Sequence, residues 1–161
     1  MGIRSTARVL QISTTTLLKR IISIARSIQS KPIYKGKIYE VDEMRTFIKN
    51  KNLLIWIVYA LERKTNRVVS FAVGRRTKRT LRNVINTLLL SSPKTIYTDG
   101  LKQYKYLIDQ SIHKVKRYGT NHIERNNLSI RPHLKRLNRK TICFSRSFVM
   151  LMCVLRIYFW V

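Results

Sequence analysis

Residues 53–61 read LLIWIVYAL, a nearly continuous apolar run that is rich in β-branched and aromatic side chains. A run of this length and composition is typical of a strand that is covered on both faces of a sheet. Residues 37–42 (KIYEVD) alternate in polarity before it, which indicates another strand. After it come the turn residues 64–66 (KTN) and a third strand at 68–73, ended by Gly74. Short links between these three strands predict antiparallel hairpins.

Helices and shorter strands follow the hairpins. Residues 77–90 repeat apolar side chains at helical spacing, and residues 91–93 (SSP) end this helix. We expect a strand at 95–98, a helix at 101–108, an edge strand at 112–115 and a long basic helix at 122–137, kinked by Pro132. Hairpins followed by a crossover to further strands predict an α/β fold with a mixed sheet flanked by helices. This is the arrangement of an RNase H-like fold.

The two ends of the chain differ from this central part, residues 31–147. Residues 1–30 read as two short helices with a tight turn, which indicates a partial helix-turn-helix segment that binds DNA. A helical hairpin that only packs explains the same pattern equally well. Residues 148–161 are strongly apolar but too short for a bilayer, which takes about 20 residues to cross, so we expect an element that packs on the core.

The chain is strongly basic, with 33 Lys and Arg against 7 Asp and Glu and a formal charge of +26. A compact state with this charge repels itself, and a polyanion relieves the repulsion, so nucleic acid is the leading partner. An anionic membrane surface and a structural RNA are the alternatives. Cys143 and Cys153 are too few for a disulfide framework or a four-ligand zinc site, and no signal peptide is apparent. These features predict a reduced, cytoplasmic setting.

Because acidic residues are so few, their positions are informative. Asp42 ends the first strand, Asp99 ends the fourth strand, and Glu124 opens the basic C-terminal helix. If the two strands are neighbours, both aspartates lie at one sheet edge, where a crossing helix can add the glutamate. Three carboxylates at one point repel each other unless a cation lies between them, and such oxygen ligands suit Mg²⁺ or Mn²⁺. Two ions about 3.5–4 Å apart can promote cleavage and rejoining of a phosphodiester.

Each of these acids also has an ordinary structural explanation. An aspartate after a strand is commonly a turn or cap residue, so Asp99 before Gly100 fits a simple turn. Glu124 fits a solvated helix face. Glu43 competes with Asp42 for the site because adjacent strand residues point to opposite faces, whereas Glu40 shares the face of Asp42 and is a candidate partner for it.

Six blocks of sequence, in this order, resemble the transposases of the insertion-sequence-one family. They are residues 40–44 (EVDEM), 56–65 (WIVYALERKT), 74–77 (GRRT), 97–100 (YTDG), 123–128 (IERNNL) and 134–145 (LKRLNRKTICFS). No single block proves the match, which runs in order over roughly residues 1–147. The resemblance implies a DDE transposase whose RNase H-like catalytic domain covers residues 31–147. It assigns Asp42, Asp99 and Glu124 as catalytic residues that bind two Mg²⁺ or Mn²⁺ ions.

The resemblance also implies the reaction and the partners. Strand cleavage at the element's ends frees a 3′-OH, which then attacks target DNA. The family has a basic residue seven positions after the glutamate, here Arg131, expected to contact DNA phosphate near the scissile bond. The partners would be double-stranded DNA, further copies of the chain and a zinc-module protein from an upstream reading frame, because the family's N-terminal cysteine module is missing here. The setting would be the nucleoid of a prokaryotic cell.

Basic clusters are the candidates for holding DNA phosphate. The expected DNA-binding residues are Lys19, Arg20, Arg75, Arg76, Lys135, Arg136, Arg139 and Lys140. His122, two residues before Glu124, faces another side of a helix and is a candidate DNA contact. Two rival hypotheses remain open: a catalytically inactive basic DNA-binding remnant that inhibits transposition, and a ribosomal-type RNA-binding protein.

Overall fold

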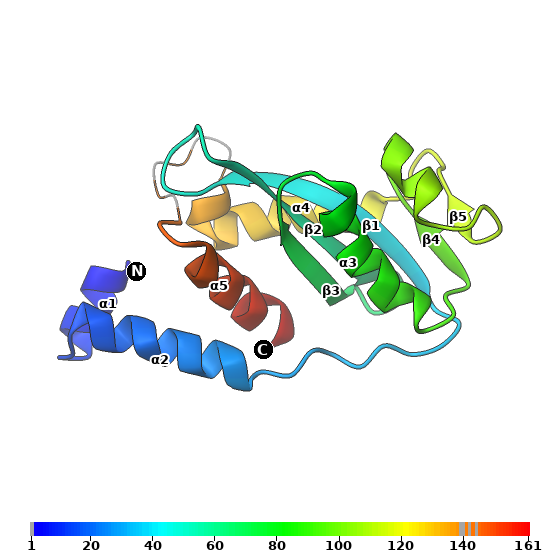
Figure 1. Ribbon diagram of the computed structural model, residues 1–161. Helices are drawn as coiled ribbons and strands as arrows, with labels where there is room; N and C mark the ends of the chain where they lie inside the picture. Colours follow the sequence, from blue (N-terminus) through cyan, green and yellow to red (C-terminus); the bar gives the residue numbers. More distant parts are fainter. Residues whose placement is uncertain (1, 139–140, 142, 144) are drawn as a thin grey trace. The chain divides into compact units, whose positions relative to one another are not determined.

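A five-stranded mixed sheet forms the centre of residues 30–145 in a computed structural model, which describes residues 2–138, 141, 143 and 145–161. The strands lie in the order β3-β2-β1-β4-β5 (Figure 1). Their bounds are Ile38–Phe47 (β1), Leu54–Glu62 (β2), Arg67–Gly74 (β3), Thr95–Tyr97 (β4) and His113–Lys114 (β5). β1, β2 and β3 pair antiparallel, whereas β4 pairs in parallel with β1 and with β5. This topology is that of an RNase H-like fold, as the sequence predicts.

The apolar run at 53–61 forms β2 because both faces of this strand are covered. Every residue from 57 to 61 has no exposed surface. β1 lies beside β2 over its whole length, with Asp42 opposite Tyr59. It extends five residues beyond the predicted end of the first strand, because residues 43–47 continue the pairing with β2.

Helices cover both faces of the sheet (Figure 1). On one face, α3 (Lys78–Leu89) packs on β2 and β3, and its apolar side chains form the core with Tyr39 and Val41 of β1. On the other face, α4 (Asn121–His133) packs on β1 and β2. Because side chains alternate along a strand, the even-numbered residues of β1, which include Asp42, point toward α4.

Two predicted helices are shorter in the structure. The helix expected at 101–108 is a 3₁₀ helix, η1 (Lys102–Tyr106), because the N–H group of Leu107 donates to the Tyr104 carbonyl three residues back. The helix expected at 122–137 ends at His133 and is followed by a separate 3₁₀ helix, η2 (Lys135–Leu137). Pro132 lies in the last turn of α4, where its ring and missing N–H oppose a further turn.

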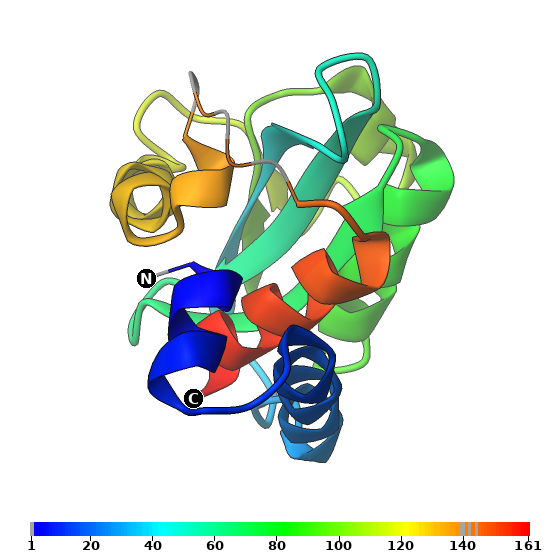
Figure 2. The ribbon, with the colours of Figure 1, turned by 90° about the vertical axis from the view of Figure 1, so that its left-hand side faces the viewer.

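Residues 2–29 and 146–161 form a second compact unit. It contains α1 (Ile3–Val9), α2 (Thr14–Ser27) and α5 (Phe148–Trp160), and α5 lies against α2 (Figure 2). Ser13 caps α2, as its hydroxyl oxygen accepts from the N–H of Thr16 at 3.0 Å. Arg156 ties α5 to the end of α2 by donating to the carbonyl oxygen of Ile28 from Nε at 3.0 Å and from Nη2 at 2.7 Å. The division into parts at residues 1–30, 31–147 and 148–161 stays a prediction.

Candidate active site

The pairing of β1 with β4 places the first two predicted acids next to each other. The parallel register matches Ile38 with Thr95 and Glu40 with Tyr97. The ladder ends at this pair, and Asp42 and Asp99 each follow two residues later along their own segments. The charge of Asp99 is among the causes that raise the pKa of Asp42, so the two carboxylates affect each other. The predicted first and fourth strands are therefore neighbours, although Asp42 lies in the middle of β1 and not at its end.

Asp42 is a half-buried carboxylate with two hydrogen-bond donors. Its Oδ1 accepts from the backbone N–H of Glu43 at 2.7 Å, and its Oδ2 accepts from Nδ2 of Asn127 at 2.7 Å. Burial is the largest cause that raises the pKa of this carboxyl to about 6, the negative charges of Asp99 and Glu43 add to the rise, and the two hydrogen bonds oppose it. The negative charge of Asp42 is thus poorly compensated, which favours a nearby cation.

Asp99 is exposed and shapes the turn that follows β4. Its Oδ1 accepts from the N–H of Leu101 at 3.1 Å, and Gly100 has a φ of +85°, which favours glycine. Asp99 therefore fits the turn explanation, and it is also near enough to Asp42 for its charge to raise the pKa of that carboxyl. The backbone of this turn sets where the carboxylate lies.

α4 is held against the sheet by polar side chains from β1 and β2. Glu40 accepts from the backbone N–H of Ile123 at 3.0 Å. The Tyr59 hydroxyl lies 2.8 Å from Oδ1 of Asn127 and 3.2 Å from the carbonyl oxygen of Ile123, and it can donate to either. Asn127 also contacts Asp42, so this face of the helix is directed toward the first acid.

The third predicted acid, Glu124, does not join the two aspartates in this structure. Its side chain is exposed, and its Oε1 accepts from the Thr120 hydroxyl at 2.7 Å. Within the part of the chain that the structure describes, there is no group of three or more His, Cys, Asp or Glu residues placed to hold a metal ion. Glu124 does lie about one helical turn before Asn127, which contacts Asp42, so the two residues share a side of α4.

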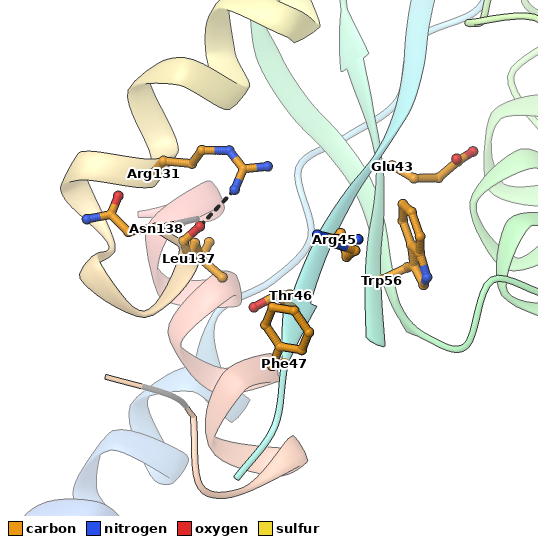
Figure 3. A pocket seen from close by; sticks show the side chains of 8 residues that line it. All are labelled: Glu43, Arg45, Thr46, Phe47, Trp56, Arg131, Leu137 and Asn138. Carbon is orange, nitrogen blue, oxygen red and sulfur yellow. Dashed lines mark hydrogen bonds between the residues drawn. The ribbon is translucent and has the colours of Figure 1, made fainter. Parts of the chain in front are cut away.

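A cavity of about 380 Å³ lies along the second half of β1 (Figure 3). Its lining residues are Glu43, Arg45, Thr46, Phe47, Trp56, Arg131, Leu137 and Asn138. Arg131 points from α4 toward β1, and its Nη1 donates to the carbonyl oxygen of Leu137 at 2.9 Å. Arg131, the predicted phosphate contact, thus lines this cavity together with residues of β1.

A family model described as IS1 transposase matches residues 37–160. The chain belongs to the IS1 transposase family. It is 37% identical over 110 residues to the insertion element iso-IS1n protein InsB of Shigella dysenteriae, with 68% of this chain and 84% of the relative covered. It is 34% identical over 108 residues to the insertion element IS1 protein InsB of Shigella flexneri, with 67% and 82% covered. The resemblance drawn from the six sequence blocks is confirmed.

Two solved structures show a weaker likeness. The catalytic core domain of HTLV-2 integrase in complex with magnesium, in a trimeric form, has a TM-score of 0.47 and 14% identity, over 77% of this chain and 86% of that one. A chain of the simian T-cell lymphotropic virus intasome in complex with PP2A regulatory subunit B56 gamma also has a TM-score of 0.47, with 13% identity, over 96% of this chain and 63% of that one.

No helix among the described residues has the length and apolar character that crossing a membrane requires.

The predicted DNA-binding residues of this IS1-family chain differ in their surroundings. Lys19 and Arg20 on α2, Arg75 before α3 and Lys135 in η2 are exposed. Arg136 is partly buried and its Nη1 donates to the Ser145 hydroxyl at 3.2 Å, while burial lowers its pKa. Arg139 and Lys140 lie outside the described residues.

Arg76 has a partner within the protein. It donates to Glu43 from Nε at 3.1 Å and from Nη2 at 2.7 Å, and its guanidinium lies 4.6 Å from the centre of the Trp56 ring. Glu43 is buried and also accepts from the Tyr104 hydroxyl, and burial together with the Glu43 charge raises the pKa of Tyr104. Glu43 therefore points to the face of the sheet opposite Asp42, where it accepts hydrogen bonds from Arg76 and Tyr104.

Tyr104 and Asn127 are two site residues that the sequence reasoning did not single out. Asn127 could have been found, because it lies three residues after Glu124 and so shares a helix face with it. Tyr104 gave no comparable signal, since a tyrosine in a short helical pattern is commonly a core residue.

Proposed function

We propose that this IS1-family chain is an active DDE transposase that cleaves DNA strands at the element's ends and transfers the freed 3′-OH into target DNA. The observation that supports the proposal most is the parallel pairing of β1 with β4, which ends two residues before Asp42 and Asp99, together with the effect of the Asp99 charge on the pKa of Asp42. Two neighbouring carboxylates at a sheet edge, in a chain with a charge of +26, suit a divalent cation and a polyanionic substrate together.

The donor set fits Mg²⁺ or Mn²⁺. Asp42 and Asp99 supply oxygen ligands, and the raised pKa of Asp42 reflects a charge that a cation would compensate. We propose that Glu124 completes the set by turning its side chain from Thr120 toward the aspartates. This rotation breaks one hydrogen bond between side chains, which contributes about 1 kcal/mol. Two bound ions would activate the attacking oxygen and stabilise the leaving oxygen of the phosphodiester.

The chain's own basic residues would hold the substrate during two displacements. In the first, a water oxygen attacks phosphorus and the bond to the 3′ oxygen breaks, which leaves a 3′-OH on the element. In the second, that 3′-OH attacks a target phosphodiester, forms a new bond to phosphorus and displaces the target's 3′ oxygen. We propose that Arg131, at the rim of the cavity, holds a phosphate next to the scissile one, and that the exposed Lys19, Arg20, Arg75 and Lys135 contact DNA further away.

We assign the parts of the chain and its partners on the same basis. Residues 1–30 would bind DNA, 31–147 would carry the catalysis, and 148–161 would pack on the core. Double-stranded DNA is the substrate, and joining two element ends calls for more than one copy of the chain. A zinc-module protein from an upstream frame is a further proposed partner.

The test is strand cleavage of DNA that carries the element's own ends, with Mg²⁺ or Mn²⁺ present. Asp42→Asn, Asp99→Asn and Glu124→Gln are expected to lose cleavage by several orders of magnitude while they retain DNA binding. Asp109→Asn is the matched control, because Asp109 is an exposed carboxylate whose contacts are with Ser111. Cleavage that survives in the three site variants at the level of Asp109→Asn would exclude this site.

The second candidate is the inactive DNA-binding remnant that inhibits transposition. It is favoured by one observation, the hydrogen bond that directs Glu124 to Thr120 and away from the aspartates. This candidate predicts salt-sensitive DNA binding without cleavage at any Mg²⁺ or Mn²⁺ concentration, and a reduced rate when the chain is added to an active transposase.

A further inference from the structure

Glu40 is a buried carboxylate that is neither a proposed metal ligand nor a proposed DNA contact. None of its side chain is exposed. Its Oε1 lies 2.7 Å from Nδ1 of His122 and 3.3 Å from Nε of Arg63, and its Oε2 accepts from the backbone N–H of Ile123 at 3.0 Å. A charge buried this deeply is costly unless its oxygen atoms are fully partnered, as they are here.

Glu40, its side-chain partners and the residue paired with it in the sheet lie close in sequence to all three proposed metal ligands. Glu40 lies in β1, two residues before Asp42. The guanidinium of Arg63 lies 4.7 Å from the ring centre of Tyr97, which ends β4 two residues before Asp99. His122 lies in the first turn of α4, two residues before Glu124. We call Glu40, Arg63, Tyr97 and His122 the Glu40 cluster.

The cluster also replaces a missing helix cap. The first N–H groups of a helix have no partner within it, and an N-cap side chain commonly accepts from one of them. Thr120 occupies the N-cap position of α4 but makes no such bond, and its hydroxyl donates to Glu124 instead. Glu40 accepts from Ile123 in its place, and its negative charge at the helix N-terminus is favourable.

The spacing links this cap to the metal ligands. In a strand, side chains two residues apart share a face and are separated by about 7 Å, so Glu40 fixes the backbone next to Asp42. Through Ile123 and His122 the same carboxylate sets the height and rotation of the first turn of α4, on which Glu124 stands. Tyr97 pairs with Glu40 in the sheet, and its ring contacts Arg63. These contacts hold in place the segment that leads to Asp99.

We infer that Glu40 is a positioning residue that holds the three ligand-bearing segments in one arrangement through the Glu40 cluster, so that a divalent cation can bind between Asp42, Asp99 and Glu124. The inference rests on the proposed function. Glu40 does not itself contact the metal or the DNA, because it is fully buried under α4. Partners of this kind behind metal ligands typically change metal affinity by about 10- to 100-fold when they are removed.

The experiment measures Mn²⁺ binding to the full chain by the electron paramagnetic resonance signal of free Mn²⁺, without DNA. Glu40→Gln is expected to weaken Mn²⁺ binding by about 10-fold. Its amide oxygen can still accept from Ile123, but the charge that draws in His122 and Arg63 is lost. Glu62→Gln is the matched control, since Glu62 is also a buried strand carboxylate with a cationic neighbour, Lys37 at 3.9 Å, and is expected to bind Mn²⁺ like the wild type.

A second pair of variants tests the positioning role if Glu40→Gln fails to fold, which circular dichroism would reveal. His122→Ala removes only one partner of Glu40, from a side chain that is 41% exposed, and is expected to weaken Mn²⁺ binding several-fold. His122→Asn keeps an N–H group that can donate to Glu40 and is expected to restore the affinity. A purely structural role of the cluster would change stability in both variants and leave Mn²⁺ binding alike.

The outcomes separate the two proposals. If wild type binds Mn²⁺ more tightly than Asp99→Asn while folded Glu40→Gln or His122→Ala binds like wild type, the metal site stands and the positioning role is wrong. If wild type and Asp99→Asn bind Mn²⁺ equally weakly, the metal site itself fails, and the positioning role fails with it. Weaker binding in Glu40→Gln, with Glu62→Gln unchanged, supports both.

Discussion

Replacing Asp42 by asparagine should stabilise the metal-free protein at neutral pH. Burial and the charges of Asp99 and Glu43 raise the pKa of Asp42 from its ordinary value of 3.8 to about 6. An acid whose pKa is higher in the folded state than in the unfolded state holds its proton more tightly when folded. Its ionised form therefore opposes folding. Asp42→Asn removes that charge and keeps nearly the same shape.

The size of the effect follows from the shift in the pKa of Asp42. At about 1.4 kcal/mol for each pH unit, the rise from 3.8 to about 6 corresponds to about 3 kcal/mol. The amide can still accept from Glu43, but its own N–H groups face those of Asn127, and one lost hydrogen bond offsets about 1 kcal/mol. We therefore expect Asp42→Asn to gain about 2 kcal/mol in free energy of unfolding, an order-of-magnitude value.

The difference in stability between wild type and Asp42→Asn should grow as the pH rises. Below pH 3.8 Asp42 is protonated in both states, so the charge contributes nothing to the difference between the two proteins. Between pH 3.8 and about 6 the unfolded chain has lost the proton that the folded chain retains, so wild type loses stability relative to the variant as pH rises. Above pH 6 the difference reaches its full size.

Urea denaturation in EDTA, followed by circular dichroism between pH 3.5 and 8, measures this difference. A gain of about 2 kcal/mol moves the midpoint by about 1 M urea. Added Mg²⁺ should raise the midpoint of wild type but not that of Asp42→Asn, because only the wild type has both aspartates as ligands. An offset between the two proteins that does not change between pH 3.5 and pH 8 would refute the reasoning from the raised pKa.

Three further predictions concern the surroundings of this site. Tyr104→Phe should destabilise the fold by about 1–3 kcal/mol in urea denaturation, because Glu43 then keeps only part of its buried hydrogen bonding; an unchanged midpoint would count against that network. Gly100→Ala should cost about 1–3 kcal/mol and reduce cleavage, because its φ is +85° and a Cβ there would lie 3.1 Å from Val115. Gly36→Ala, with a φ of +68° and open space, should lower stability without reducing cleavage, so equal activity of the two alanine variants would contradict this explanation. The affinity for duplex DNA, measured by fluorescence anisotropy, should fall linearly with salt on a double-logarithmic plot, and a flat response would rule out phosphate contacts as its main source.

The predictable part of this fold lies where one physical requirement dominates the sequence. Residues 57–61 of β2 must be apolar on both sides because helices cover both faces of the sheet, and this leaves an unmistakable run. α3 was equally clear, since its apolar side chains recur at helical spacing and Thr77 accepts from the N–H of Thr80 at its start. In both segments the local sequence pattern and the tertiary packing favour the same secondary structure.

The parts that the sequence did not reveal depend on contacts between distant residues. Glu40 caps α4 across 83 positions of the chain, and no local pattern marks a strand residue as a helix cap. The same holds for Glu43 and Tyr104, which lie 61 positions apart. Pro132 was visible, yet the residue at which α4 would end depends on how the following turn packs.

The three predicted metal ligands illustrate this difference within one site. Asp42 and Asp99 each follow a ladder of backbone hydrogen bonds between β1 and β4 by two residues, so strand order alone predicts that their segments lie close together. Glu124 stands on a helix surface, where an exposed side chain takes the direction of its best available partner, here Thr120. A single side-chain hydrogen bond contributes about 1 kcal/mol, so a cation held by the two aspartates would need to offset only about that much to turn Glu124 toward it. Backbone pairing thus brings together the segments that carry Asp42 and Asp99, and we expect a bound cation to decide the rotamer of Glu124.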